Sequence, residues 1–116
     1  MSKLVRFNIG DVTPKLNPPF FPEVLEGNPT TRAWSFSSTE DGRGAAGIWE
    51  CTPCVWRIDY TGIWEFCHII EGQCVITPDG GTAVELSPGD AFVCEPGLKG
   101  TWRVVSKLLK HFTVIQ

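Results

Sequence analysis

Turn-forming residues divide the chain from Trp34 onward into short apolar stretches, and this spacing constrains the fold more than any other feature. Short strands between evenly spaced turns are typical of an all-β sandwich or barrel. We therefore predict two packed antiparallel sheets over about Trp34 to Val114. The turn signals are Glu40-Asp41-Gly42, Glu71-Gly72, Pro78-Asp79-Gly80-Gly81, Ser87-Pro88-Gly89-Asp90 and Glu95-Pro96-Gly97.

The first 33 residues differ from the rest because they are rich in proline. Proline lacks a backbone donor, so this segment is not expected to form a long helix or a central strand. We predict that residues 1–33 form an arm, laid over the barrel or over a partner subunit. Residues 34–116 would form the barrel, since a chain of 116 residues has room for one domain. The prolines are Pro14, Pro18, Pro19, Pro22 and Pro29.

Charge and hydropathy exclude several classes of partner. The net charge is -3 and there is no basic run, which argues against nucleic acid. The first residues lack the continuous apolar segment of a signal peptide, and no later run reaches membrane-spanning length. We expect a soluble cytoplasmic protein with no membrane partner.

The five cysteines are an odd set in a chain without a secretion signal, which favours reduced, buried thiols over a disulfide framework. Cys51 and Cys54 have the spacing of a redox pair or half a zinc site. A structural zinc site needs four ligands, and a redox pair needs a helix N-terminus where this sequence predicts strand. We therefore expect free thiols, with Cys67 and Cys94 the least reactive.

Two motifs carry a family resemblance. In the stretch 60–72, six residues separate Glu65 from Gly72, which is the spacing that closes the first cupin motif. In the stretch 87–97, a Gly-Asp pair is followed by a short apolar strand and a Pro-Gly pair. Together with segments 47–53, 97–102 and 110–111, they resemble the small cupins named for the cupin domain of (S)-ureidoglycine aminohydrolase. The chain is also similar to an ethanolamine-utilisation cupin. The resemblance implies an RmlC-like cupin jelly-roll barrel of two antiparallel sheets.

The resemblance also implies where a metal ion would bind. A metal-binding cupin supplies two histidines shortly before its glutamate and a third after the second motif. Of these ligands only Glu65 is present, and a carboxylate without imidazole is a poor site for a divalent ion. We therefore predict no metal and no cofactor. The histidine positions fall on Asp59 and Thr61, or on Ile58 and Tyr60, and on Gly100.

Strand alternation predicts the residues that line the barrel. If Glu65 points inward, a period of two places Cys67 inward as well and His68 on the outer face. Gly100 in place of a larger side chain is expected to leave room for a ligand beside Trp102. The predicted cavity is lined by Glu65, Cys67, Tyr60, Trp56, Cys94 and Trp102.

The lining residues suggest roles. Glu65 and Tyr60 are the candidate catalytic residues, because a carboxyl group in an aromatic pocket can act as a general acid or base. The alternative for Glu65 is a buried acid paired with Tyr60 or with a backbone donor. The candidate ligand-binding residues are Trp56, Cys67, Cys94, Lys99 and Trp102, with Lys99 as a cation at the mouth of the barrel.

Four functions stay open at this stage, the last of which is a purely structural or accessory dimer. The first is a cupin with an aromatic small-molecule pocket and no metal. The second is a metal-dependent cupin enzyme that acts on a small nitrogen-containing metabolite, and the third is a non-catalytic metabolite-binding module. We also expect a homodimer, because exposed strand edges need cover; the Leu4 to Ile9 segment or the outer face with Phe66 and His68 would provide the interface.

Overall fold

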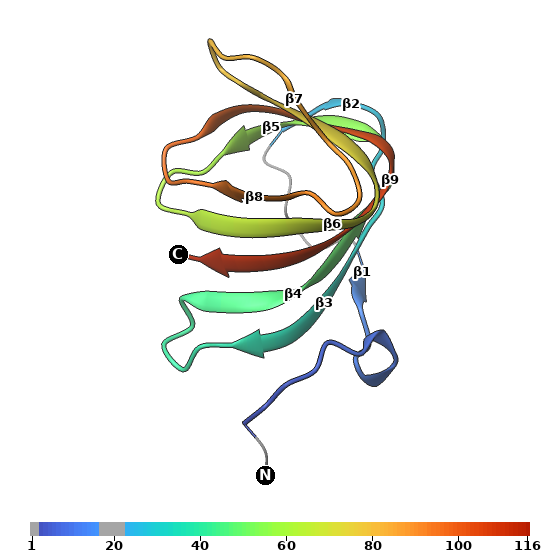
Figure 1. The fold of residues 1–116 in the computed structure, drawn as a ribbon, viewed down its shortest axis with the longest axis vertical. Coiled ribbons are helices and arrows are strands. Elements are labelled where there is room, and N and C mark those ends of the chain that lie inside the picture. The colour runs from blue at the N-terminus through green and yellow to red at the C-terminus, as the bar shows by residue number, and fades with distance from the viewer. Residues whose placement is uncertain (1–2, 17–22) are drawn as a thin grey trace.

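The computed structural model describes residues 3–16 and 23–116, which form one curled, all-β unit (Figure 1). The prediction of an all-β barrel is confirmed. A short 3-10 helix, η1 (Ile9–Asp11), precedes the strands. The strands are β1 (Lys15–Leu16), β2 (Val24–Glu26), β3 (Thr31–Ser38), β4 (Gly44–Cys51), β5 (Cys54–Asp59), β6 (Trp64–Pro78), β7 (Val84–Leu86), β8 (Ala91–Cys94) and β9 (Lys99–Ile115).

The two long strands β6 and β9 connect the layers of the barrel, and Figure 1 shows both curving around it. They pair antiparallel from Trp64 opposite Ile115 to Pro78 opposite Gly100. One layer runs β1-β3-β4, then the C-terminal half of β9, the N-terminal half of β6, and β8. The other runs β2-β5, the N-terminal half of β9, the C-terminal half of β6, and β7.

A glycine marks the place where β6 passes from one layer to the other. Gly72 has a φ of +84°, and the pairing of β6 with β9 shifts register on both sides of it. A Cβ atom there would clash with the carbonyl oxygen of Lys107, so only glycine permits this approach of the two strands. The resulting bulge bends the strand and so closes the barrel.

The described parts of the predicted arm add strands at the edges of the barrel. β1 pairs with β3, and β2 pairs with β5. β3 begins at Thr31, ahead of the predicted boundary at residue 33. Pro18, Pro19 and Pro22 lie outside the described residues. No helix in ranges 3–16 and 23–116 has the length and hydropathy needed to cross a membrane.

The core confirms the predicted alternation along β6. Glu65, Cys67 and Ile69 are buried, whereas Phe66 and His68 between them are only partly buried. The same alternation buries Trp102 and Val104 on β9, with the exposed Arg103 between them. Because alternate side chains of a strand point to opposite faces, these patterns define the inner surface of the barrel.

Candidate functional site

A carboxylate, a phenol and an ammonium group meet inside the barrel. Glu65 lies on β6, Tyr60 directly follows β5, and Lys110 lies on β9. The Tyr60 hydroxyl donates to Glu65 Oε1 at 2.6 Å, and Lys110 Nζ donates to Glu65 Oε2 at 3.2 Å. Both carboxylate oxygens therefore have a partner, which a buried charge requires. Glu65 is thus a buried acid paired with Tyr60, and Lys110 is its second partner.

Backbone contacts hold Tyr60 in this position. Its N–H donates to the carbonyl oxygen of Leu98 at 2.8 Å, and its carbonyl oxygen accepts from Gly97 at 3.1 Å. The loop after β5 is thus tied to the loop before β9. These two loops close the same end of the barrel and place the phenol over the carboxylate.

The Lys110 side chain is almost completely buried, with 3% of its surface exposed. Besides Glu65, it contacts Cys67 Sγ at 3.2 Å and lies over the rings of Trp49 and Trp102, 5.0 and 4.7 Å from their centroids. Register explains these contacts, since Lys110 stands directly opposite Trp49 on β4. The indole faces supply cation–π attraction that partly replaces lost hydration.

The electrostatics of this cluster keep the lysine charged. Burial opposes the charge, but hydrogen bonds to Cys67 and Glu65, together with the negative charge of the carboxylate, outweigh it and raise the pKa of Lys110 above its ordinary value of 10.5. Burial, reinforced by Glu65, raises the pKa of Tyr60. Burial raises the pKa of Cys67 to about 12, so this residue is a thiol at neutral pH. The site therefore holds one ammonium, a neutral phenol and a neutral thiol around the carboxylate.

Indole rings form the wall beside these polar groups. Trp56 on β5 stands opposite Trp102 on β9, and their rings stack with centroids 5.1 Å apart. Among the described residues, the buried Nε1–H of Trp102 has no nitrogen or oxygen acceptor. The Cys74 thiol, which is a weak acceptor, lies close enough to interact with it. A buried donor without a good acceptor is uncommon in native structures and costs stability.

The structure brings most of the predicted lining together in one buried cluster. Trp56, Tyr60, Cys67, Cys94 and Trp102 belong to one buried cluster, and Glu65 is 5% exposed. The partly buried side chains of Ala33, Ile63, Phe92, Leu98 and Phe112 pack against this cluster.

The expectation that Gly100 leaves room for a ligand is wrong. A Cβ atom at this position would clash with the carbonyl oxygen of Thr77, because β6 and β9 approach each other closely where Pro78 pairs with Gly100. Glycine is needed here for the packing of two backbones. It does not enlarge the space beside Trp102.

Two other residues considered in the sequence lie away from this cluster. Lys99 is exposed at the start of β9, opposite Asp59 on β5, so it lies at the rim and outside the buried cluster. His68 lies on the outer face, as predicted. There it stands opposite His111, with their Nδ1 atoms 3.2 Å apart.

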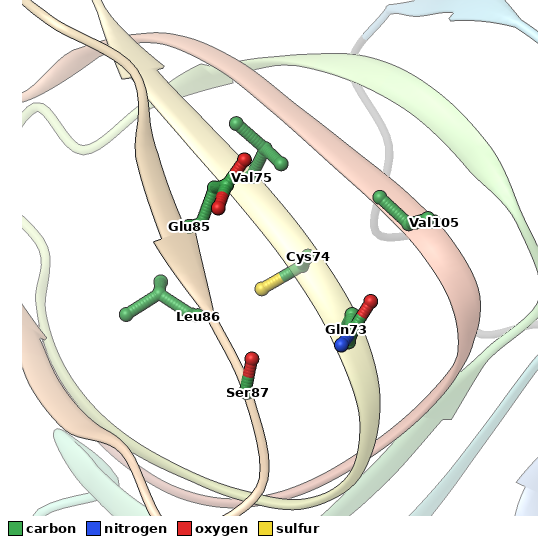
Figure 2. Close-up of a pocket in the computed structure, with 7 residues that line it drawn as sticks. All are labelled: Gln73, Cys74, Val75, Glu85, Leu86, Ser87 and Val105. Carbon is green, nitrogen blue, oxygen red and sulfur yellow. The ribbon is translucent and has the colours of Figure 1, made fainter.

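A separate pocket of about 170 Å³ lies where β6, the β7 region and β9 meet (Figure 2). Of the predicted site residues, none lines it. Its lining consists of Gln73, Cys74, Val75, Glu85, Leu86, Ser87 and Val105.

The residues around Glu65 do not fit a metal ion. Its neighbours are a phenol, a thiol and an ammonium, and the ammonium contacts the oxygen that an ion would bind. Within the described residues, no group of three or more His, Cys, Asp or Glu side chains is arranged to hold a metal. Both histidines lie on the outer face, on the opposite side of the sheet from Glu65.

Lys110 is the residue of this site that the sequence interpretation missed. The resemblance covers Lys110 but assigns it no chemistry, and a fully buried lysine is rare. A signal was present: a period of two from the inward residues Trp102 and Val104 arrives at Lys110. Ser106 interrupts the buried series because it is exposed, but Leu108 and Lys110 resume it and are both buried.

Comparison with known families and structures places this geometry in context. Residues 38–112 match the EutQ-like cupin domain. None of the proteins with a curated description matches the chain. The resemblance to cupins is thereby confirmed, whereas the narrower likeness to the ureidoglycine aminohydrolase domain stays a prediction.

Several solved structures share the fold. The EutQ protein of Clostridium difficile is 18% identical with a TM-score of 0.65, covering 76% of this chain and 64% of its own. A DUF861 protein of unknown function from Pseudomonas syringae is 21% identical with a TM-score of 0.75, covering 89% of this chain and 43% of its own. A protein described as a predicted oxalate decarboxylase from Thermotoga maritima is 16% identical with a TM-score of 0.72, covering 97% of both chains. The chain thus spans less than two thirds of the first two proteins, and these identities speak for the fold alone.

Proposed function

We propose that this chain, which belongs to the EutQ-like cupin domain family, binds a small flat molecule inside its barrel without the help of a metal ion. The observation that carries the proposal is the buried cluster of Tyr60, Glu65 and Lys110 against a wall of indole rings. A structural core gains nothing from burying an ion pair that apolar side chains of the same volume would replace at little cost. Convergent polar groups in an apolar barrel are instead typical of ligand sites.

The unused hydrogen-bonding capacity of the site indicates the class of ligand. Trp102 Nε1–H lacks a good acceptor, and one N–H of Lys110 points to a thiol, which accepts only weakly. Oxygen atoms of carbonyl or carboxylate groups would be better acceptors for these donors than thiols are. The indole rings of Trp56 and Trp102, which stack on each other, form an apolar wall that suits a flat molecule carrying such oxygen atoms.

The ligand would enter at the end of the barrel that Tyr60 closes. Ile63 and Leu98 belong to the two loops at this end, and both are only partly buried over the core cluster. We propose that these two side chains move aside when the ligand binds. Side-chain rearrangement of this kind is common at binding sites whose backbone stays in place.

Catalysis at the same site is the second candidate. The 2.6 Å hydrogen bond between the Tyr60 hydroxyl and Glu65 Oε1 has the geometry that general acid–base chemistry requires. The likeness to the ureidoglycine aminohydrolase cupin domain favours a small nitrogen-containing metabolite as substrate. A metal-dependent form of this activity is the least favoured candidate function, because the groups around Glu65 do not fit a metal ion.

A panel of flat carboxylates, amides and ureides tests the proposal. We expect at least one compound to raise the melting temperature of the wild type, and Glu65→Gln or Trp102→Phe to reduce that rise. Glu40→Gln, an exposed glutamate in the turn after β3, is the control and should leave the rise unchanged. Turnover of a bound compound that Glu65→Gln abolishes while binding persists would identify an enzyme. If no compound in the panel shifts the wild type, the barrel is a structural core and the proposal is wrong.

We further propose that the protein is a cytoplasmic homodimer. The arm exposes the apolar side chains of Leu4, Val5 and Ile9, which a second copy would cover. The outer face with Phe66 and His68 offers a further apolar surface. Light scattering at micromolar concentration should give twice the mass of one chain, and a monomer mass would contradict the proposal.

A further inference from the structure

The positive charge of Lys110 lies beside the one metal-ligand position that this cupin retains. Lys110 Nζ is 3.2 Å from Glu65 Oε2 and 3.2 Å from Cys67 Sγ. Carboxylate oxygen and thiolate sulfur are both zinc ligands in proteins, so the ammonium contacts two groups that would otherwise suit an ion. Indole faces on either side exclude water from this position.

We propose that the Lys110 ammonium takes the place of a metal ion as the fixed cation of the barrel, so that the site is a metal centre converted into a lysine centre. Glu65 needs a positive partner because an unpaired buried carboxylate is strongly destabilising. Lys110 supplies that partner from the chain itself. It also repels a dication at short range in a medium of low dielectric constant. Lys110 is therefore the positioning residue for Glu65, whether or not a ligand is bound.

The geometry indicates that one substitution, Lys110→His, would restore a metal site. An imidazole is shorter than a lysine side chain by roughly one zinc–nitrogen bond, which is about 2 Å. A zinc ion bound to a histidine at position 110 would consequently lie near the present position of Nζ. From there Glu65 and Cys67 need to approach by only about 1 Å to reach bonding distances. A zinc ion bound there would also convert Cys67 to its thiolate form, because bound zinc deprotonates a ligating thiol.

Zinc alone serves as the probe, which makes this test independent of ligand binding. We compare the full-length wild type, Lys110→His, and the double variant Lys110→His/Glu65→Gln after zinc addition and dialysis. Lys107→His is the matched control, because Lys107 lies on the same strand with a 56% exposed side chain. We expect about one equivalent of retained zinc in Lys110→His, and at least tenfold weaker binding in the other three proteins. Raised thermal stability of Lys110→His with zinc should accompany the uptake.

Two results would overturn the inference. One is a folded Lys110→His protein that retains no more zinc than Lys107→His. The other is wild-type protein that binds zinc in a manner abolished by Glu65→Gln, since the ammonium would then not exclude the ion. If Lys110→His does not fold, nitrogen-15 NMR of the wild type decides: a slowly exchanging ammonium signal near the Trp102 ring supports the inference, and its absence at neutral pH contradicts it. A negative result in the ligand panel would leave either zinc result valid.

Discussion

Lys110 Nζ lies 3.2 Å from Glu65 Oε2 in the centre of the barrel, although the two residues are 45 positions apart in the sequence. Both side chains are nearly inaccessible to water, with exposed fractions of 3% and 7%. The pair joins β6 to β9, the two strands that connect the layers. Its removal therefore affects both the charge balance of the site and the packing of the barrel.

Lys110→Met should destabilise the protein by about 3–5 kcal/mol, because it leaves the Glu65 carboxylate buried without its cation. Urea unfolding monitored by tryptophan fluorescence measures this loss. Lys107→Met should change stability by no more than about 0.5 kcal/mol, because the Lys107 side chain is 56% exposed and its contact with Glu50 is long, at 3.8 Å. The double variant Lys110→Met/Glu65→Gln should be more stable than Lys110→Met alone. Equal effects at positions 107 and 110 would count against a buried ion pair.

Tyr60→Phe should cost about 1.5–3 kcal/mol, since it removes a hydrogen bond to a charged acceptor. The volume of the side chain hardly changes, so the packing of the neighbouring cysteine and tryptophan side chains should be retained. The far-ultraviolet circular dichroism spectrum should therefore be unaltered. Thr61→Val is the control, because its hydroxyl donates to the exposed Asp59. A stability loss as small as that of Thr61→Val would indicate that the Tyr60 hydroxyl is not bonded to Glu65.

The five cysteines should resist alkylation in the native protein. All five are buried, and burial raises the pKa of Cys74 and Cys94 to about 11. Cys51 and Cys54 lie with their sulfur atoms 3.7 Å apart, in contact but not bonded. Mass spectrometry after iodoacetamide treatment should find little modification until urea is added, and five modified thiols afterwards. An untreated sample with a Cys51–Cys54 disulfide would contradict this account.

Stability should fall as the pH drops below about 6.5, the ordinary pKa of histidine. Burial and the neighbouring His68 lower the pKa of His111 in the folded state from its ordinary value of 6.5. The unfolded chain then binds the proton more readily, so the stability present above pH 6.5 is lost as the pH falls towards the folded pKa. His111→Gln should flatten the dependence between about pH 7 and pH 5.5, above the range where carboxylates titrate. An unchanged slope in this variant would assign the effect to other groups.

The arrangement of strands and the inward face of the barrel were predictable from the sequence. Turn residues fixed where strands end, and a period of two on β6 separated the buried Glu65 and Cys67 from the outward His68. These features depend on neighbouring residues along one strand. They therefore leave a clear pattern in a single sequence.

The centre of the site was less predictable, because it depends on contacts between distant strands. The cation that balances the charge of Glu65 is Lys110, 45 positions further along the chain, and no residue near Glu65 in the sequence predicts this pairing. Gly100 illustrates the same limit. A glycine can leave space for a ligand or allow another backbone to approach closely. The pairing of Gly100 with Pro78 shows that close approach is its role here, and this pairing is visible only in the structure.

Elemental analysis of the purified full chain tests the central claim most directly, namely that the barrel is a site built around Lys110 without a metal ion. The protein is to be produced without added metal and purified without chelators, alongside Glu65→Gln. We predict no transition metal near one equivalent in either protein. Near-stoichiometric zinc, nickel or iron in the wild type that disappears in Glu65→Gln would contradict the account.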